Sequence, residues 1–133
     1  MSEGGASGGV RGILRLEGLA LFAAAIFFYV QAAASWKLFA LLFLVPDLSF
    51  AFYLFGPRIG AAAYNTMHST IGPVSLALFA LVARPDMPLL IPIALIWFAH
   101  VGFDRALGYG LKYASGFSDT HLGAIDKKRQ QLA

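Results

Sequence analysis

Long apolar stretches alternate with very short polar breaks along most of the chain. Four stretches are long enough to cross a bilayer as helices, because a hydrocarbon core of about 30 Å needs roughly 20 helical residues. They are Leu14–Ala34, Trp36–Phe55, Ile59–Ala83 and Met87–Gly108. The breaks hold only one to three residues, which predicts antiparallel neighbours in an up-down-up-down order. The pattern therefore predicts an all-α, polytopic membrane four-helix bundle.

Two segments flank this predicted four-transmembrane-helix domain, which covers residues 13–110. Residues 1–12 hold five glycines and no apolar run, which predicts a flexible tail. Residues 111–133 mix polar and apolar groups, and we expect a cytoplasmic-side C-terminal segment that folds back over the bundle. Pro46, Pro73 and Pro92 fall inside predicted helices, and we expect each of them to mark a kink.

The composition supports a membrane location. Hydrophobic residues make up 59% of the 133 residues and charged residues 13%, which is about half the charged share of a soluble domain. So much apolar surface excludes an ordinary soluble globular domain. The absence of cysteine excludes disulfides, thiolate metal sites and cysteine nucleophiles.

Basic residues gather on one side of the predicted bundle. With four spans, both termini and the second break share a side that holds most of the Lys and Arg residues, whereas the other side has Lys37 and Arg84. The positive-inside rule then places both termini in the cytoplasm. The basic tail Asp126–Arg129 indicates contact with anionic lipids and not with nucleic acid, because no aromatic residues interleave the short basic run.

Seven polar residues lie inside the predicted spans, where burial in lipid is costly: Glu17, Gln31, Asp47, Asn65, His68, His100 and Asp104. Such groups usually face a bundle interior or a cavity. Counted along the helices, all but Gln31 lie about 5–14 Å from the cytoplasmic ends, so six polar side chains from four helices converge in one layer. Asp47 has only apolar and small neighbours on its own helix face, so its partner must come from another helix.

A divalent metal is the economical explanation of this layer. Imidazole nitrogens and carboxylate oxygens suit Zn²⁺, Mn²⁺ or Fe²⁺, and a metal with a bound water predicts a hydrolase. We predict a metal-dependent membrane hydrolase that acts on a lipid-like substrate at the cytoplasmic leaflet. The predicted metal ligands are Asp47, His68, His100 and Asp104. The predicted catalytic residues are Asp104, His121 and Glu17, and the predicted supporting residues are Asn65, Tyr64 and Arg105.

Several alternatives use the same residues. A bis-histidine haem can lie between His68 and His100, although Asp47 and Asp104 crowd a pocket that is normally apolar. Proton- or ion-coupled transport is a second alternative, although the polar layer stops halfway across the membrane. A non-enzymatic structural subunit of a membrane complex needs no site at all. A homo-oligomer is also expected, because four helices leave little room for both a cavity and a packed interior.

Several short blocks of the chain match the sequence pattern of a known protein family. They are Arg15–Gly18, Pro46–Ser49, Tyr64–His68, Ala99–Arg105, Gly108–Lys112, Gly116–Phe117 and Thr120–Gly123. In these blocks the chain resembles a family of short four-helix bacterial membrane proteins classed as a domain of unknown function. The resemblance covers nearly everything from Leu14 to Gly123. It implies a bacterial inner membrane protein and no particular substrate or cofactor. The family's pattern includes most of the polar residues named above, and also His121.

Overall fold

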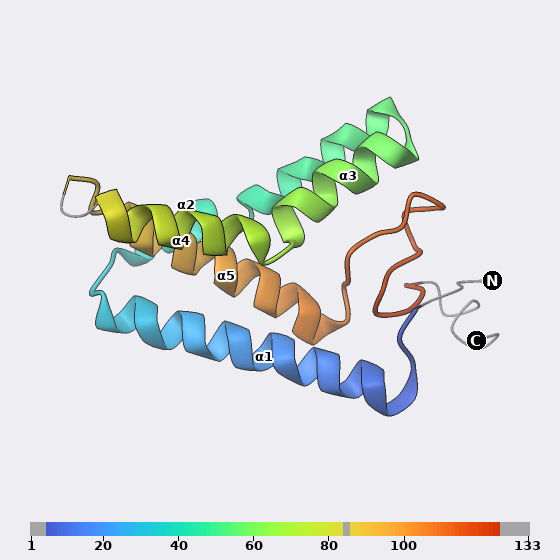
Figure 1. The fold of residues 1–133 in the computed structure, drawn as a ribbon, viewed down its shortest axis with the longest axis horizontal. Coiled ribbons are helices and arrows are strands. Elements are labelled where there is room, and N and C mark those ends of the chain that lie inside the picture. The colour runs from blue at the N-terminus through green and yellow to red at the C-terminus, as the bar shows by residue number, and fades with distance from the viewer. Residues whose placement is uncertain (1–4, 84–85, 126–133) are drawn as a thin grey trace.

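Figure 1 shows a computed structural model of the protein, which describes residues 5–83 and 86–125. The helical elements are α1 (Gly8–Gln31), α2 (Trp36–Leu42), the 3-10 helix η1 (Val45–Phe55), α3 (Pro57–His68), α4 (Ile71–Ala83) and α5 (Leu90–Leu107). Across the described residues the structure has no strand, and one isolated bridge joins Lys112 to Thr120. The all-α fold class is confirmed.

Three helical segments are long and apolar enough to cross a membrane. They are Gly8–Gln31, Trp36–Phe55 and Leu90–Leu107, where the second consists of α2 continued by η1. Helices α3 and α4 meet at a 43° bend and pass the same test only as a pair. Large apolar side chains such as Leu54 and Val82 stand exposed on the outside, as lipid-facing surface does. The protein is therefore a membrane protein by the length and composition of its helices, and the fourth crossing stays a prediction.

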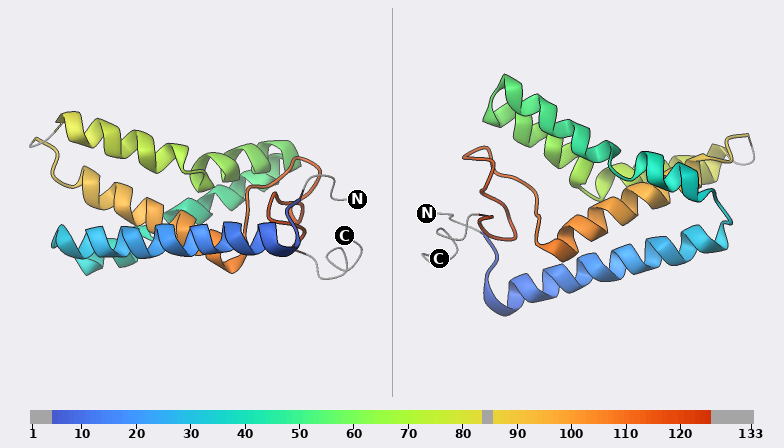
Figure 2. Two further views of the ribbon diagram at one scale, coloured as in Figure 1. Left: turned by 60° about the horizontal axis from the view of Figure 1, so that its bottom comes forward. Right: turned by 180° about the vertical axis from the view of Figure 1, so that it is seen from behind.

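The chain reverses direction at its short connections, as Figures 1 and 2 show. Helix α5 packs against α1 and α4, and α3 packs against η1. The first described residues meet the segment that follows α5, where the Ala6 amide donates to the His121 carbonyl at 2.7 Å. Both described ends of the chain therefore lie at the same end of the bundle. Their cytoplasmic orientation stays a prediction.

Two glycines allow α1 and α5 to approach closely. A Cβ atom at Gly18 would lie 2.4 Å from Arg105 Cβ, and one at Gly102 would lie 2.6 Å from the Phe22 amide nitrogen. Small residues commonly let membrane helices pack backbone against backbone in this way. This contact sets the position of α5, which carries His100 and Asp104.

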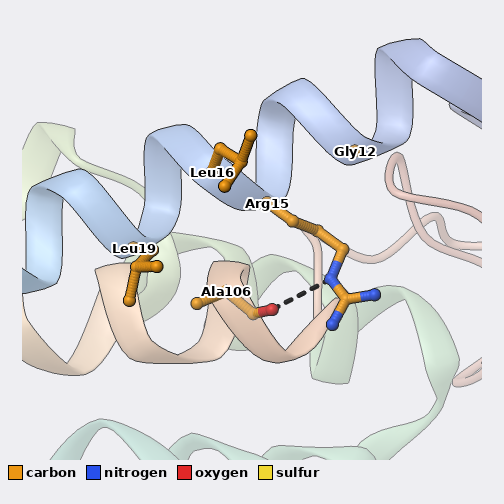
Figure 3. A pocket seen from close by; sticks show the side chains of 5 residues that line it. All are labelled: Gly12, Arg15, Leu16, Leu19 and Ala106. Carbon is orange, nitrogen blue, oxygen red and sulfur yellow. Dashed lines mark hydrogen bonds between the residues drawn. The ribbon is translucent and has the colours of Figure 1, made fainter.

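The end of α5 is tied to α1 by an arginine. Arg15 Nε donates to the Ala106 carbonyl at 2.9 Å, across a groove that Gly12, Leu16 and Leu19 also line (Figure 3). The last carbonyls of a helix have no partner within the helix. Arg15 therefore satisfies one of them and fixes the end of α5 against α1.

The prolines begin helices in this structure, where kinks inside helices were predicted. Pro46, Pro73 and Pro92 lie in the first turns of η1, α4 and α5, where a proline costs little because the missing amide has no helical partner. The ring of a proline clashes with the carbonyl four residues earlier. For Pro73 that residue is Ser69, and the third predicted span breaks there, with Ser69 in an extended conformation.

The ends of the predicted segments also differ from the structure. Helix α1 begins at Gly8, so residues 8–12 are helical although the sequence predicts a flexible tail. The hydrogen bond between Ala6 and His121 anchors the chain just before this helix, a long-range contact that local composition does not reveal. The basic tail Asp126–Arg129 and Arg84, used above for the topology, lie outside the described residues.

Candidate metal centre

Two histidines and two aspartates from three helices meet inside the bundle. Asp47 comes from η1, His68 ends α3, and His100 and Asp104 lie one turn apart on α5. One ligand atom of each residue lies within 4.8 Å of the others. Both histidines are buried, while both aspartates keep some exposure. The structure thus brings together all four residues predicted as metal ligands, and Asp47 finds its partners on other helices.

Five of the six separations between the ligand atoms lie between 3.0 and 3.3 Å. The two histidine Nε2 atoms lie 3.0 Å apart. Asp47 Oδ1 lies 3.1 Å from His68 Nε2 and 3.3 Å from His100 Nε2, and Asp104 Oδ2 lies 3.3 Å from each of the same two nitrogens. Four ligands at about 2.0–2.1 Å from a tetrahedral ion are separated by roughly 3.3–3.4 Å. These five separations are close to those of a tetrahedral zinc-type site, and the two aspartate oxygens lie within 4.8 Å of each other.

The hydrogen bond at His68 Nδ1 is compatible with a cation at the centre of the group. His68 Nδ1 lies 2.9 Å from the Tyr64 carbonyl, and since a carbonyl only accepts, Nδ1 carries the proton of the neutral ring. The Nε2 lone pair then faces two carboxylates and a second imidazole. Acceptors gathered in this way need a proton or a cation between them. A backbone partner on the distal nitrogen is also the usual support of a metal-binding histidine.

The break after α3 positions the His68 ring. Two carbonyls that the helix end leaves free are taken by α5, because Trp97 Nε1 donates to Met67 at 2.6 Å and Arg105 Nη2 donates to His68 at 3.3 Å. The Tyr64 ring stacks on the His68 imidazole with centroids 3.8 Å apart. Tyr64 and Arg105, both predicted as supporting residues, thus hold this ligand in place.

The segment after α5 covers one side of the group. Asn65 Nδ2 donates to the Lys112 carbonyl at 2.8 Å, and the Lys112 amide donates back to Asn65 Oδ1 at 2.7 Å. This reciprocal pair is the role that the structure gives Asn65. A cavity of about 390 Å³ lies beneath the segment, lined by Asp47, Phe50, Tyr64, Asp104, Tyr109, Lys112, Phe117 and Ile125. The candidate metal centre therefore opens onto a largely aromatic cavity.

Lys112 belongs to this site, although from the sequence it counts only among the basic residues that predict the membrane orientation. Its side chain is buried, and Nζ donates to the Phe117 carbonyl at 2.8 Å. The same atom lies 3.7 Å from the ring centroid of Phe117 and 4.8 Å from that of Tyr64. Burial lowers the pKa of Lys112 to about 8, against the opposing effect of the Asp104 charge. Its only sequence signal is a place in the block Gly108–Lys112, because an irregular segment has no periodicity from which to infer a direction.

Two predicted catalytic residues lie outside the four-residue group. Glu17 is exposed on α1. His121 lies in the segment after α5, where its Nδ1 accepts from the Leu111 amide at 2.8 Å. Burial, with a smaller contribution from the Arg105 charge, lowers the pKa of His121. The catalytic roles of Glu17 and His121 stay predictions, and the contact seen for His121 stabilises the covering segment.

A haem does not fit between the two histidines. Bis-histidine ligation places two nitrogens on opposite faces of the porphyrin, about 4 Å apart across the iron. Here the Nε2 atoms are 3.0 Å apart, and oxygens of Asp47 and Asp104 lie where the porphyrin ring would have to pass. The donor set suits a small ion.

Comparison with known proteins adds the family. A family model described as Domain of unknown function (DUF4260) matches residues 11–125. The chain belongs to this family. The DUF4260 match includes all four residues of the candidate metal centre and the covering segment, and it confirms the family resemblance inferred from the sequence blocks. No curated protein and no solved structure matches the chain.

Proposed function

We propose that Asp47, His68, His100 and Asp104 bind one divalent metal ion in a metal-dependent membrane hydrolase. The observation that carries the metal site is the spacing of its four ligand atoms, with separations of 3.0–3.3 Å around both histidine nitrogens. Two nitrogens and two oxygens suit Zn²⁺, Mn²⁺ or Fe²⁺. A divalent ion also balances the charges of the two aspartates.

The cavity beside the four residues supports hydrolysis. The Asp47 side chain is 36% exposed and lines the cavity together with Asp104, so a substrate can reach the ligand set. A divalent ion supplies water activation and polarisation of the scissile bond. One ester bond is split, with the hydroxyl of water going to the acyl or phosphoryl group and the proton to the leaving alcohol. In this proposal Asp104 accepts the proton of the attacking water.

The lining of the cavity supports a lipid-like substrate. Phe50, Tyr64 and Phe117 form much of its wall, and Phe50 and Phe117 are themselves exposed at the protein surface. Such a wall accommodates hydrocarbon next to the polar ligand set. The charge distribution in the sequence supports an orientation with four crossings and both termini in the cytoplasm. The substrate would then enter from the cytoplasmic leaflet of a bacterial inner membrane.

Elemental analysis of the detergent-purified protein tests the metal site. We expect about one equivalent of metal per chain, and at least a tenfold loss in His68→Gln and in Asp104→Asn, since each removes a direct ligand. His121→Gln and Asp86→Asn are matched controls, because they remove the same residue types outside the group, and both are expected to keep the metal. Substoichiometric metal that is equal in all these proteins would overturn the proposal.

The same preparations separate the other functions. Hydrolysis of fluorogenic esters and phosphoesters that is lost with the metal supports the hydrolase. A Soret absorption band would select a haem, and proton flux in liposomes that disappears in Asp47→Asn would select transport. A structural subunit would be selected if these variants leave the metal content, the absorption spectrum and the proton flux unchanged but alter the association of the protein with another membrane protein.

A further inference from the structure

The charges around the proposed metal centre do not balance once Lys112 and Arg105 are counted together with the ion. Asp47 and Asp104 contribute two negative charges. Two cations lie beside them: Lys112 lines the same cavity, and Arg105 bonds to the His68 carbonyl. These four groups sum to zero, so a divalent ion leaves a net charge of plus two. Uncompensated charge in an apolar environment is costly, so the loaded site calls for an anion.

We infer that the cavity binds the anionic head group of an amphiphile, of the phosphate type, and that the Lys112 ammonium is the cation that docks it. This inference rests on the proposed function, because the excess positive charge comes from the metal. A phosphate head carries one to two negative charges and several acceptor oxygens. It therefore matches both the charge and the donors that the loaded cavity offers.

The position of Lys112 supports this assignment. Lys112 belongs to the covering segment, whose backbone the Asn65 side chain fixes with two hydrogen bonds. An ammonium has three donors, and one of them goes to the Phe117 carbonyl. Because that segment and the two aspartates line one cavity, a head group bound by Lys112 lies next to the metal ligands.

The aromatic rings around Lys112 support an amphiphile over a free anion. Phe50, Tyr64 and Phe117 face the ammonium at 3.7–5.8 Å from their ring centroids and also line the cavity. The same rings therefore stabilise the cation and offer apolar surface for the first methylenes of an alkyl chain. A cavity of about 390 Å³ also falls within the usual range for small-ligand sites, about 300–1,000 Å³.

Titration calorimetry on the full-length, metal-loaded protein in neutral detergent tests the inference. The probes are octyl phosphate, octylammonium, octanol and inorganic phosphate. We expect octyl phosphate to bind more tightly than the other three. Lys112→Gln should weaken octyl phosphate binding about tenfold or more, because a hydrogen bond from a charged donor is lost, while octanol binding stays unchanged. Lys112→Arg keeps the charge and should restore most of the affinity. Lys37→Gln, which removes an exposed lysine on α2, is the matched control.

Several results would overturn the inference. One is equal binding of octyl phosphate and octylammonium, and another is an unchanged affinity of Lys112→Gln for octyl phosphate. A third is equal weakening of octyl phosphate and octanol binding in Lys112→Gln, which would indicate that Lys112 has a purely structural role. If inorganic phosphate binds as tightly as octyl phosphate, the ligand is a free anion, and the assignment of the cavity to an amphiphile is overturned. Metal content is measured on the same samples. Its absence from the wild-type protein overturns the proposed function, whereas a fully loaded protein without a preference for octyl phosphate overturns only the head-group assignment.

Discussion

The four residues of the candidate metal centre are held to different degrees by their surroundings. The His68 ring is stacked on Tyr64 and bonded to a backbone carbonyl, so its orientation is fixed before any ion arrives. Asp47 keeps a third of its side-chain surface exposed and meets the group through the two histidines. The rigid half of the site therefore lies at the break between α3 and α4, and the adaptable half faces the cavity.

Lys112 gives the folded protein a measurable pH dependence. Burial lowers its pKa to about 8, below the value of about 10.4 in an unfolded chain. Between these values the unfolded chain binds a proton that the folded chain has lost, so the free energy of unfolding rises with pH. His121, with its pKa also lowered, titrates below this range.

We therefore expect the melting temperature of the metal-free protein, relative to Lys112→Gln, to rise between about pH 7.5 and 9.5. Thermal unfolding of both proteins in neutral detergent with a chelator present measures the difference. A difference that stays constant over this range would contradict the burial of a titrating Lys112.

Single residues of the site were predictable where polar side chains interrupt apolar helical segments. Asp47, His68, His100 and Asp104 stand out as polar groups in apolar helices, and counting residues gives their depth. Depth alone does not tell which way neighbouring helices face. Glu17 was therefore placed in the same layer although the structure leaves it exposed on α1.

At the scale of the helices, the contact between α1 and α5 determines where two of the four ligands lie. The close approach of α1 and α5 depends on Gly18 and Gly102, because atoms of the partner helix occupy the space that a side chain at either position would need. His100 is two residues from Gly102 on the same helix. A change in the separation of α1 and α5 therefore moves ligands as well as lipid-facing residues.

Gly102→Ala is expected to destabilise the protein by about 1–3 kcal/mol, the usual cost of overpacking, because the new Cβ would lie 2.6 Å from a backbone nitrogen of α1. It should also lower the metal content. Gly12→Ala is the matched control, since nothing lies within 4 Å of a Cβ at that position of α1, and alanine favours the helix. Unfolding in detergent and elemental analysis measure both effects. Equal behaviour of the two variants would contradict the close packing.

The helices were predictable as apolar stretches, but their interruptions were not. Pro73 was correctly taken as a source of irregularity, yet its effect falls four residues earlier, on the carbonyl of Ser69. The hydrophobic pattern likewise does not distinguish an α-helix from the 3-10 helix η1. In a bilayer both kinds of helix carry apolar residues on their buried face and on their lipid-facing surface, so the pattern has no period that separates them. The break at Ser69 matters for the site, because it frees the carbonyls that Trp97 and Arg105 bind.

For the whole molecule, orientation in the membrane decides from which leaflet the cavity is reached. The described ends meet through Ala6 and His121, and the cavity lies beneath the segment that makes this contact. Asp86 belongs to the connection between α4 and α5, and Figure 1 shows the end of α4 and the start of α5 at the end of the bundle opposite the start of α1. If the chain crosses four times, three crossings lie between Ser7 and Asp86, and an odd number of crossings puts these two positions in opposite compartments. Self-association of the chain remains a prediction at this scale.

Cysteine labelling tests the orientation without background, because the chain has no cysteine of its own. A membrane-impermeant maleimide should label Asp86→Cys in intact cells, and should label Ser7→Cys and Ala114→Cys only after permeabilisation, since all three sites are exposed. Labelling of Ser7→Cys from outside would reverse the orientation. Labelling of Ser7→Cys and Asp86→Cys from the same side would exclude four crossings.

The order of the ligands along the chain has a consequence for biosynthesis. Asp47 and His68 belong to η1 and α3, but His100 and Asp104 both belong to α5, the last helix of the described chain. A nascent chain that has not yet released α5 from the ribosome holds only half of the donor set. At the proposed metal site, capture of an ion would therefore follow insertion of the last helix, and the metal occupancy of newly made protein would report how completely that final insertion step has run.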